Sequence, residues 1–379
     1  MDEEPLPALL TGEGADLTDP GQVDRALATL WRPPAGYRAA DPVGAATRVC
    51  AANLLVVADE ADRTWISQVL GSLSPRYPTR TIVWLADVGS RRRSKSRSRN
   101  GDTVRAWVFA LCHVPQPGRP QVCCEQIVLR EPTGDTECDL MQTILPLLES
   151  DVPTMGWWRL PVGSRRPWYR ALVGLSDRLI VDAGPAGLAR YKEAAGRVVR
   201  ELGWYRTAHW RDWLAGLFDG DAAATLESLT ELHVRTGPGD RDARTDAVWI
   251  AAFVAGQLGW KPVQYEADGW RLAAGERPVR VRIDEDPIVA AGIDSVTLSD
   301  DSRRCEVARW AGARNAYRIA EHTGVSCRLP RTVEAPRADA ADALVAALTG
   351  RPSDRAFERA APIAAWLAGT STRKTRRGG

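Results

Sequence analysis

The segment between residues 49 and 88 constrains the fold more than any other part of this chain. Val49–Ala58 is a continuous apolar run, which is typical of a strand covered on both faces. Asp62–Ser74 carries apolar residues at helical spacing, and Thr81–Val88 is a second apolar run. A strand, an amphipathic helix and a strand of these lengths predict a βαβ unit with parallel strands. The helix residues expected to face the sheet are Trp65, Ile66, Val69, Leu70 and Leu73.

Later segments extend this unit into an α/β domain with a mixed sheet. Val104–Val114 and Gln121–Leu129 predict two strands joined as a hairpin, and Arg178–Asp182 predicts another strand. We place this first domain at residues 48–222, after an N-terminal extension over residues 1–47 that is rich in Pro, Gly and Asp. Helices are expected at Pro20–Trp31, Leu188–Leu202 and Thr207–Asp219.

The second half of the chain follows a similar plan. Leu229–Thr236 and Pro262–Ala267 are expected to be strands on either side of an apolar helix, Thr245–Trp260. Further strands are expected at Gly269–Ala274, Pro278–Glu285, Ile293–Ser299 and Cys305–Trp310, and C-terminal helices at Asp339–Thr349 and Ser353–Ala368, the second interrupted by Pro362. We therefore expect an α/β fold: two α/β domains with mixed sheets, the second over residues 223–370 with the C-terminal helices, and an internal pseudo-repeat.

The charge of the chain is concentrated in two short segments. The net charge is +2 over 379 residues, but the loop at 90–102 and the tail at 371–379 are strongly basic. The remainder is mildly acidic, unlike the continuous basic face of a nucleic-acid-binding protein. We expect a disordered tail and a solvated loop. Docking of the loop on an acidic partner is the first alternative, and contact of the loop with a phosphate or nucleic acid is the second.

Two further patterns bear on the location of the protein. No apolar run reaches the roughly 20 residues of a membrane span. The first 20 residues are acidic, unlike a signal peptide. The protein is therefore expected to be cytoplasmic and not bound to a membrane.

The cysteines give no metal-binding pattern. They number seven, an odd count, and without a secretory signal they are expected to be free thiols. No C-x-x-C pair occurs, and Cys123 and Cys124 would point to opposite faces of a strand. Thiol redox sensing stays open as an alternative to buried strand cysteines.

Tryptophan is the unusual component, with 15 residues against 4 phenylalanines. Trp157 and Trp158 follow a helix and a Pro153 turn in an expected strand, so they should point to opposite faces, one toward the core and the other toward the surface or a partner. Trp and Arg are common anchors of protein interfaces, although packing within the fold is the alternative. The candidate partner-binding residues are Trp157, Trp158, Arg159, Trp204, His209, Trp210, Arg211 and Trp213.

Motifs for catalysis are missing from the sequence. It holds no G-x-x-x-x-G-K-[ST], G-x-S-x-G or H-E-x-x-H pattern. The nearest dinucleotide-like feature, Gly237-Pro238-Gly239, lacks the third glycine, and Pro238 has no amide to donate to a phosphate. We expect no cofactor, no metal and no catalytic residue. The competing hypothesis is an α/β enzyme or nucleotide-binding protein with a cleft at the strand ends, near Asp182 and the Gly237 turn.

Several stretches together resemble the glucose-6-phosphate dehydrogenase assembly protein family, OpcA. They are Asp151–Pro153 with Trp157-Trp158-Arg159, the junction Tyr77–Ile82, the strand Ser176–Asp182, and the segment Trp204–Trp213 with its Trp210-Arg211 pair. The resemblance implies a non-enzymatic, cytoplasmic protein that binds glucose-6-phosphate dehydrogenase. It further implies that the protein favours the active oligomer of that enzyme in the oxidative pentose phosphate pathway of a bacterium, with cyanobacteria the expected source.

Overall fold

The computed structural model forms two compact units. It describes residues 20–31, 46–88, 104–115, 119, 121–131, 140–161, 166–195, 198–218, 226–240, 242–310, 315–323, 327–334, 339–351 and 353–375. Unit 1 is Met1–Asp182 with Lys192–Arg200, and unit 2 is Ala183–Tyr191 with Glu201–Gly379. This division differs from the predicted boundary at residue 222, because the segment around Trp204 packs on helices of unit 2. The basic loop at 90–102 lies outside the described residues.

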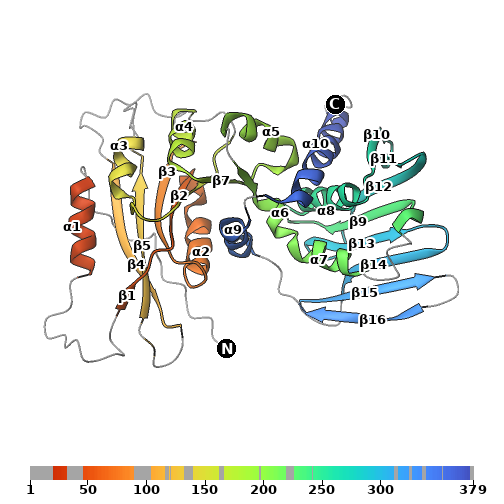
Figure 1. The fold of residues 1–379 in the computed structure, drawn as a ribbon, viewed down its shortest axis with the longest axis horizontal. Helices are drawn as coiled ribbons and strands as arrows, with labels where there is room; N and C mark the ends of the chain where they lie inside the picture. Colours follow the sequence, from red (N-terminus) through yellow and green to blue (C-terminus); the bar gives the residue numbers. More distant parts are fainter. Residues whose placement is uncertain are drawn as a thin grey trace. The chain divides into compact units, whose positions relative to one another are not determined.

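Unit 1 is built on an eight-stranded sheet (Figure 1). Its strands are β1 (Ala46–Arg48), β2 (Ala52–Asp59), β3 (Thr79–Ala86), β4 (Arg105–His113), β5 (Gln121–Arg130), β6 (Thr154–Trp158), β7 (Arg178–Val181) and β8 (Val199–Glu201). The order is β1-β5-β3-β2-β6-β7-β8, with β4 paired to β5. Strands β2 and β3 are parallel and β4 and β5 antiparallel, which confirms the βαβ unit, the hairpin and the mixed sheet.

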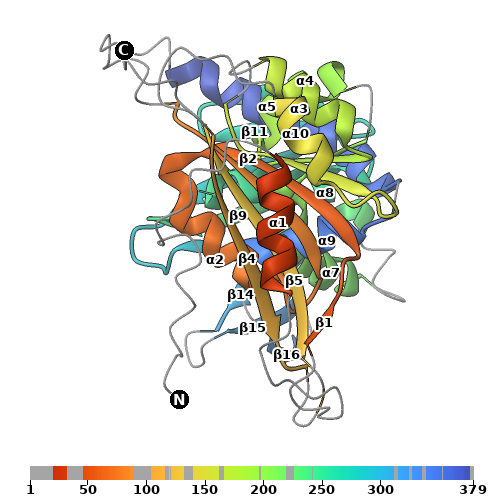
Figure 2. The same ribbon diagram turned by 90° about the vertical axis from the view of Figure 1, so that its left-hand side faces the viewer.

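Helices cover both faces of this sheet. They are α1 (Pro20–Leu30), α2 (Arg63–Leu73), α3 (Leu140–Ile144), continued by a 3-10 turn at Leu145–Leu147, and α4 (Arg166–Leu175), while α5 (Gly184–Ala195) follows β7. Helix α1 lies along β4 and β5 (Figure 2). The side chains of Val23 and Leu27 on this helix are buried. Successive residues of β5 point to opposite faces. The Cys124 thiol pairs with the hydroxyl of Ser74, which follows α2, and the Glu125 carboxylate accepts a hydrogen bond from Trp31, which follows α1. Helices α1 and α2 therefore lie on opposite sides of β5.

Unit 2 is built on a second eight-stranded sheet whose order is β10-β11-β12-β9-β13-β14-β15-β16. Its strands are β9 (Glu231–Gly237), β10 (Lys261–Glu266), β11 (Gly269–Ala274), β12 (Arg277–Glu285), β13 (Gly292–Ser299), β14 (Arg303–Arg309), β15 (Ala316–Thr323) and β16 (Cys327–Glu334). The expected pseudo-repeat does not extend to strand adjacency. Strands β2 and β3 are direct neighbours in unit 1, whereas β11 and β12 lie between β10 and β9 in unit 2.

The helices of unit 2 pack on one another and on this sheet. They are α6 (Leu202–Arg206), α7 (Ala208–Gly216), α8 (Ala243–Gln257), α9 (Ala340–Thr349) and α10 (Arg355–Thr375). The interruption expected at Pro362 is wrong, because α10 runs through this exposed proline and buries Ala364 and Leu367. Gly256 allows the close approach of α8 and α10, since a Cβ atom there would lie 3.1 Å from the backbone of Arg359. The helix also extends into the tail that we expected to be disordered, and residues 376–379 lie outside the described part.

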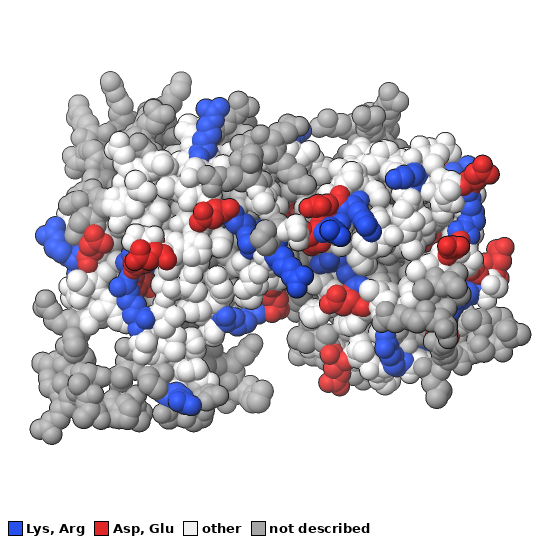
Figure 3. All heavy atoms as spheres, in the orientation of Figure 1, with Lys and Arg blue, Asp and Glu red and all other residues white. Residues whose placement is uncertain are grey.

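On the face drawn in Figure 3, the Lys and Arg side chains of the described residues lie among Asp and Glu side chains. Among the described helices, none has both the length and the apolar composition required to cross a membrane.

Candidate functional site

The carboxyl ends of the parallel strands in unit 1 form the edge where α/β sheets usually bind ligands. The chain adds β3 and β5 on one side of β2 and then β6 and β7 on the other side, so the strand order reverses between β2 and β6. Ligands of open α/β sheets bind at such a switch point. Here β2 ends in Asp59, which caps a 3-10 helix Glu60–Asp62 by accepting the N–H of Ala61 at 3.0 Å. A carboxylate therefore occupies a backbone donor that a phosphate group would use.

Arg159 fills the same edge from the end of β6. Its backbone N–H donates to Val57 at 2.9 Å, and its guanidinium lies 4.1 Å from the ring centroid of Trp65. Asp62 and Asp182 each lie 3.5 Å from guanidinium nitrogens. Asp182, which the competing hypothesis placed in a catalytic cleft, is thus an ion-pair partner of Arg159.

Trp65 is a surface residue that the sequence did not identify. Its side chain is 36% exposed, whereas the other four apolar residues expected on that helix face are buried as predicted. The indole packs 5.9 Å from the ring of Trp157 on one side and under Arg159 on the other. An exposed Trp held by an Arg has the composition of an interface anchor.

The expectation that Trp157 or Trp158 is exposed is wrong, because both are buried. Trp157 contacts Trp65 of α2, and Trp158 lies edge-on to Tyr169 of α4 at 5.2 Å. Strand β6 is central in the sheet, and helices cover the two faces to which its side chains point. Of the aromatic residues of this corner, Trp65 reaches the surface, and the side chain of Arg159 beside it is 13% exposed.

Trp204 belongs to the core of unit 2, and the half-buried Arg211 packs on its ring. Trp204 packs edge-on to Trp249 and Phe357, and its indole N–H donates to Asp354 at 2.8 Å. Arg211 stacks 3.7 Å from the ring centroid of Trp204, and burial lowers the pKa of its guanidinium to about 10. The contacts of these two side chains are made within unit 2.

The remaining predicted residues, His209, Trp210 and Trp213, come together with Tyr317 of β15 in an aromatic cluster on unit 2. Tyr317 lies 4.5 Å from Trp213 and 5.4 Å from Trp210, and His209 stacks on Trp213 at 5.9 Å. Trp210 and Tyr317 are buried, Trp213 is half-buried and His209 is exposed. Tyr317 was missed because β15 was not predicted. The cluster lines a hollow of about 70 Å³, the space of roughly two water molecules.

The Gly237-Pro238-Gly239 turn beside this hollow has a steric origin. A Cβ atom at Gly237 would lie 2.1 Å from the carbonyl oxygen of Ala290, so only glycine permits this approach of β9 to the next turn. Gly239 has a positive φ of 79°. The glycines are explained by chain geometry without a phosphate ligand.

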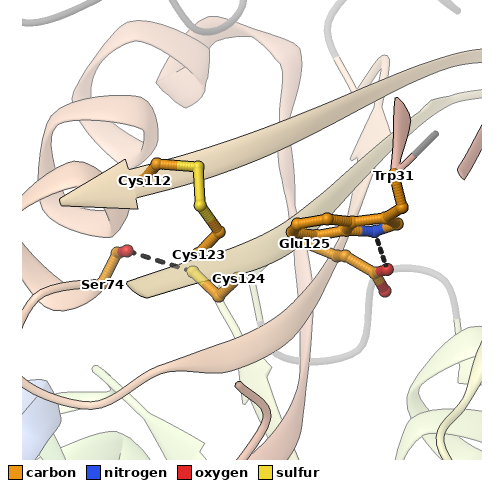
Figure 4. Close-up of a disulfide and its surroundings, with 6 residues drawn as sticks. All are labelled: Trp31, Ser74, Cys112, Cys123, Cys124 and Glu125. Atoms are coloured by element: carbon orange, nitrogen blue, oxygen red, sulfur yellow. Dashed lines mark hydrogen bonds between the residues drawn. A yellow bond between two sulfur atoms is a disulfide. The ribbon is translucent and has the colours of Figure 1, made fainter. Parts of the chain in front are cut away.

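The expectation of free thiols is wrong for one pair. Cys112 and Cys123 stand directly opposite each other on β4 and β5, with Cα atoms 4.0 Å apart, and form a disulfide (Figure 4). Cys124 points to the other face as expected, where its thiol pairs with the Ser74 hydroxyl at 3.0 Å. Burial raises the pKa of the Cys124 thiol above its usual value. Cys50 and Cys305 are free, and Cys138 lies outside the described residues.

Comparison with known proteins matches both units to one family. The model for "Glucose-6-phosphate dehydrogenase subunit N-terminal domain" matches residues 71–196, and the model for the corresponding C-terminal domain matches residues 197–361. A curated relative, "Putative OxPP cycle protein OpcA" of Synechococcus elongatus, is 22% identical over 205 residues. That alignment covers 52% of this chain and 45% of the relative, so less than half of the relative's length is matched.

Solved structures show only distant similarity. KijD10, a 3-ketoreductase from Actinomadura kijaniata in complex with NADP and TDP-benzene, is 12% identical with a TM-score of 0.48, over 84% of this chain and 97% of that one. Glucose-6-phosphate 1-dehydrogenase from Mycobacterium avium is 12% identical with a TM-score of 0.47, over 84% and 91%. Similarity at this level carries no argument about the activity of this chain.

Proposed function

This chain belongs to the glucose-6-phosphate dehydrogenase subunit family, OpcA, and from that premise we propose that it is a non-catalytic assembly factor for glucose-6-phosphate dehydrogenase. It binds the enzyme, favours its active oligomeric form and so acts as an allosteric activator in the oxidative pentose phosphate pathway.

The arrangement at the edge of the unit 1 sheet supports this proposal. The switch point that would hold a dinucleotide pyrophosphate carries Asp59, Glu60 and Asp62 after β2, and their charges repel phosphate. The arginines at this edge are already paired with carboxylates of the chain, Arg159 with Asp62 and Asp182, and Arg63 and Arg130 with Glu60. The alternative of a nucleotide-binding enzyme therefore has its expected site filled by this chain's own charged groups.

A protein without a catalytic site can activate an enzyme only by binding the active conformation more tightly than the inactive one. Linkage then requires that substrate bound to the enzyme tighten its grip on this protein by the same factor. Such coupling is commonly worth about 1–3 kcal/mol, or roughly 5- to 150-fold in affinity.

This coupling is tested with the cognate dehydrogenase. Its activity is measured across glucose 6-phosphate concentrations with and without an excess of this protein, beside a sizing run of the mixture. We expect co-elution and a lower apparent substrate requirement. Two folded proteins that neither co-elute nor change the kinetics would contradict the proposal.

We propose Trp65 and Arg159 as one contact with the enzyme. Trp65→Ala is expected to weaken the complex at least about 30-fold, the effect of losing an aromatic hot spot of about 2 kcal/mol. Isothermal titration calorimetry measures the loss, and Leu145→Ala, another exposed apolar residue of unit 1, is the control. Unchanged affinity of folded Trp65→Ala would remove this contact from the interface.

A further inference from the structure

Strand β4 lies at an edge of the unit 1 sheet, and among the described strands it pairs with β5 alone. The backbone of Cys123 in β5 faces away from β4, because its carbonyl accepts the N–H of Val49 at 2.9 Å. Cys112, directly opposite Cys123, therefore belongs to a non-hydrogen-bonded pair, and alternate residues of β4 direct their N–H and C=O groups outward. These outward residues, whose backbone groups bond to no described residue, are Ala106, Val108, Ala110 and Cys112.

This edge lacks the features that usually keep sheet edges from pairing. Proteins protect such edges with Pro, Lys or very short strands. Strand β10 carries Lys261 and Pro262, β16 carries Pro330, and β8 has three residues. Strand β4 has nine residues, contains no Pro, Gly or Lys, and is fixed to β5 by the disulfide of Cys112. A long, fixed and unprotected edge is typical of a strand that pairs with another chain.

The side chains along this edge are apolar and half-buried. Trp107, Phe109 and Leu111 lie on the face of β4 that α2 shares, since the guanidinium of Arg63 in α2 lies 5.5 Å from the ring centroid of Trp107. Helix α1 packs near β4 on the opposite face. A strand added at this edge covers apolar surface and also satisfies the outward backbone groups.

We infer that β4 pairs with β4 of a second copy of this chain, antiparallel and about a two-fold axis at Phe109. In this register Val108 exchanges hydrogen bonds with Ala110 of the second copy, and Ala106 does so with Cys112 of the second copy. Every outward N–H and C=O group of β4 then has a partner.

The side chains of β4 are self-complementary in the same register. Phe109 faces Phe109 of the second copy, and Trp107 faces Leu111, in non-hydrogen-bonded pairs, where side chains come closest. Arg105 lies opposite His113, so two arginines do not face each other. One strand thus supplies both halves of the contact, as a two-fold interface requires.

The association is tested by sedimentation velocity of the full chain over about 5–200 µM, because an interface built on one strand pair is small and weak. We expect a dimer that grows with concentration. Ala110→Pro removes an outward N–H on both sides of the axis and leaves the ladder to β5 intact, so it should weaken the dimer about 10-fold or more. Val114→Lys, at an exposed residue just beyond β4, is the control and should dimerise like the native chain.

A charge pair at the axis tests the register. Phe109→Lys and Phe109→Glu each bring two like charges face to face, so each variant alone should be monomeric over the same concentrations. An equimolar mixture of the two should form a heterodimer, because opposite charges then meet across the axis. Recovery in the mixture also shows that both variants are folded.

Three results would contradict the inference. A native chain that stays monomeric at every concentration would overturn it. Native dimers that Ala110→Pro and Phe109→Lys do not weaken must use another surface, which would overturn it as well. If both charge variants lose the dimer and their mixture does not restore it, the register centred on Phe109 is wrong. The experiment uses this chain alone, so its result does not depend on binding to the dehydrogenase.

Discussion

Replacing Trp204 by alanine is expected to lower the free energy of unfolding by about 3–5 kcal/mol, as for other buried tryptophans. The side chain is 1% exposed, and its ring contacts Trp249, Phe253 and Phe357 of α8 and α10. The substitution leaves a cavity between these helices and an unpaired Asp354 carboxylate, which otherwise accepts the indole N–H. It also removes the ring on which Arg211 stacks.

Urea unfolding followed by far-UV circular dichroism measures this loss. Trp204→Phe keeps most of the apolar volume but removes the hydrogen bond to Asp354, so it should cost about 1–3 kcal/mol. Trp213→Ala is the matched control in α7, because that residue is half-buried and should cost less than Trp204→Ala. If the Trp204→Ala protein keeps native stability but does not bind the dehydrogenase, Trp204 acts in the interface with the enzyme and not in the core.

The elements of unit 1 could be predicted because its signals are local. Val49–Ala58 and Thr81–Val88 are apolar runs that suit only strands covered on both faces, and β2 and β3 are buried along almost their whole length. The order of strands in unit 2 could not be predicted in this way. The sequence around β9, α8 and β10 has the pattern of a parallel unit with adjacent strands. In the structure β10 instead forms a hairpin with the following β11, and β12 takes the place beside β9.

Strands β15 and β16 were missed because they carry mixed polar sequences without a long apolar run. Strand β16 contains Pro330, which is tolerated because this strand is the last of its sheet and one side needs no partner. Because β15 was not predicted, Tyr317 was not recognised as the residue that contacts both Trp210 and Trp213 beside the hollow.

The exposure of individual side chains was the second feature that the sequence could not predict. Alternation correctly separates Trp157 from Trp158, but it cannot show that α2 and α4 cover the two faces. Trp65 lies at the margin of the stripe formed by Ile66, Val69 and Leu73, so its apolar spacing was compatible with burial and with exposure. Arg159 stays a candidate, and Trp65 replaces the buried pair Trp157 and Trp158, because helix packing decides which rings reach the surface and no local sequence pattern encodes that packing.

Glu125 is expected to be the most sensitive charged residue of unit 1, and Glu125→Ala should lower the free energy of unfolding by about 3–5 kcal/mol. The side chain is 2% exposed and lies 2.8 Å from Arg80 and 2.9 Å from Arg48. Trp31, at the end of α1, donates its indole N–H to the same carboxylate at 2.6 Å. Removing the carboxylate leaves Arg80 as a buried cation beside Glu149 alone and detaches the end of α1 from β5.

Comparing the loss of stability at Glu125 with the loss at Glu149 tests whether burial of the carboxylate causes the effect. Glu149 joins the same two arginines but is 33% exposed, so Glu149→Gln should cost no more than about 1 kcal/mol in urea unfolding. The double variant Arg80→Met/Glu125→Met should recover most of the stability lost in Glu125→Ala, because replacing both members of a buried pair by apolar groups is often neutral. If Glu125→Ala costs no more than Glu149→Gln, the carboxylate is hydrated and α1 is held by the packing of Val23 and Leu27. A large loss in Glu125→Ala with recovery in the double variant would show that α1 is attached to the sheet through a desolvated charge network.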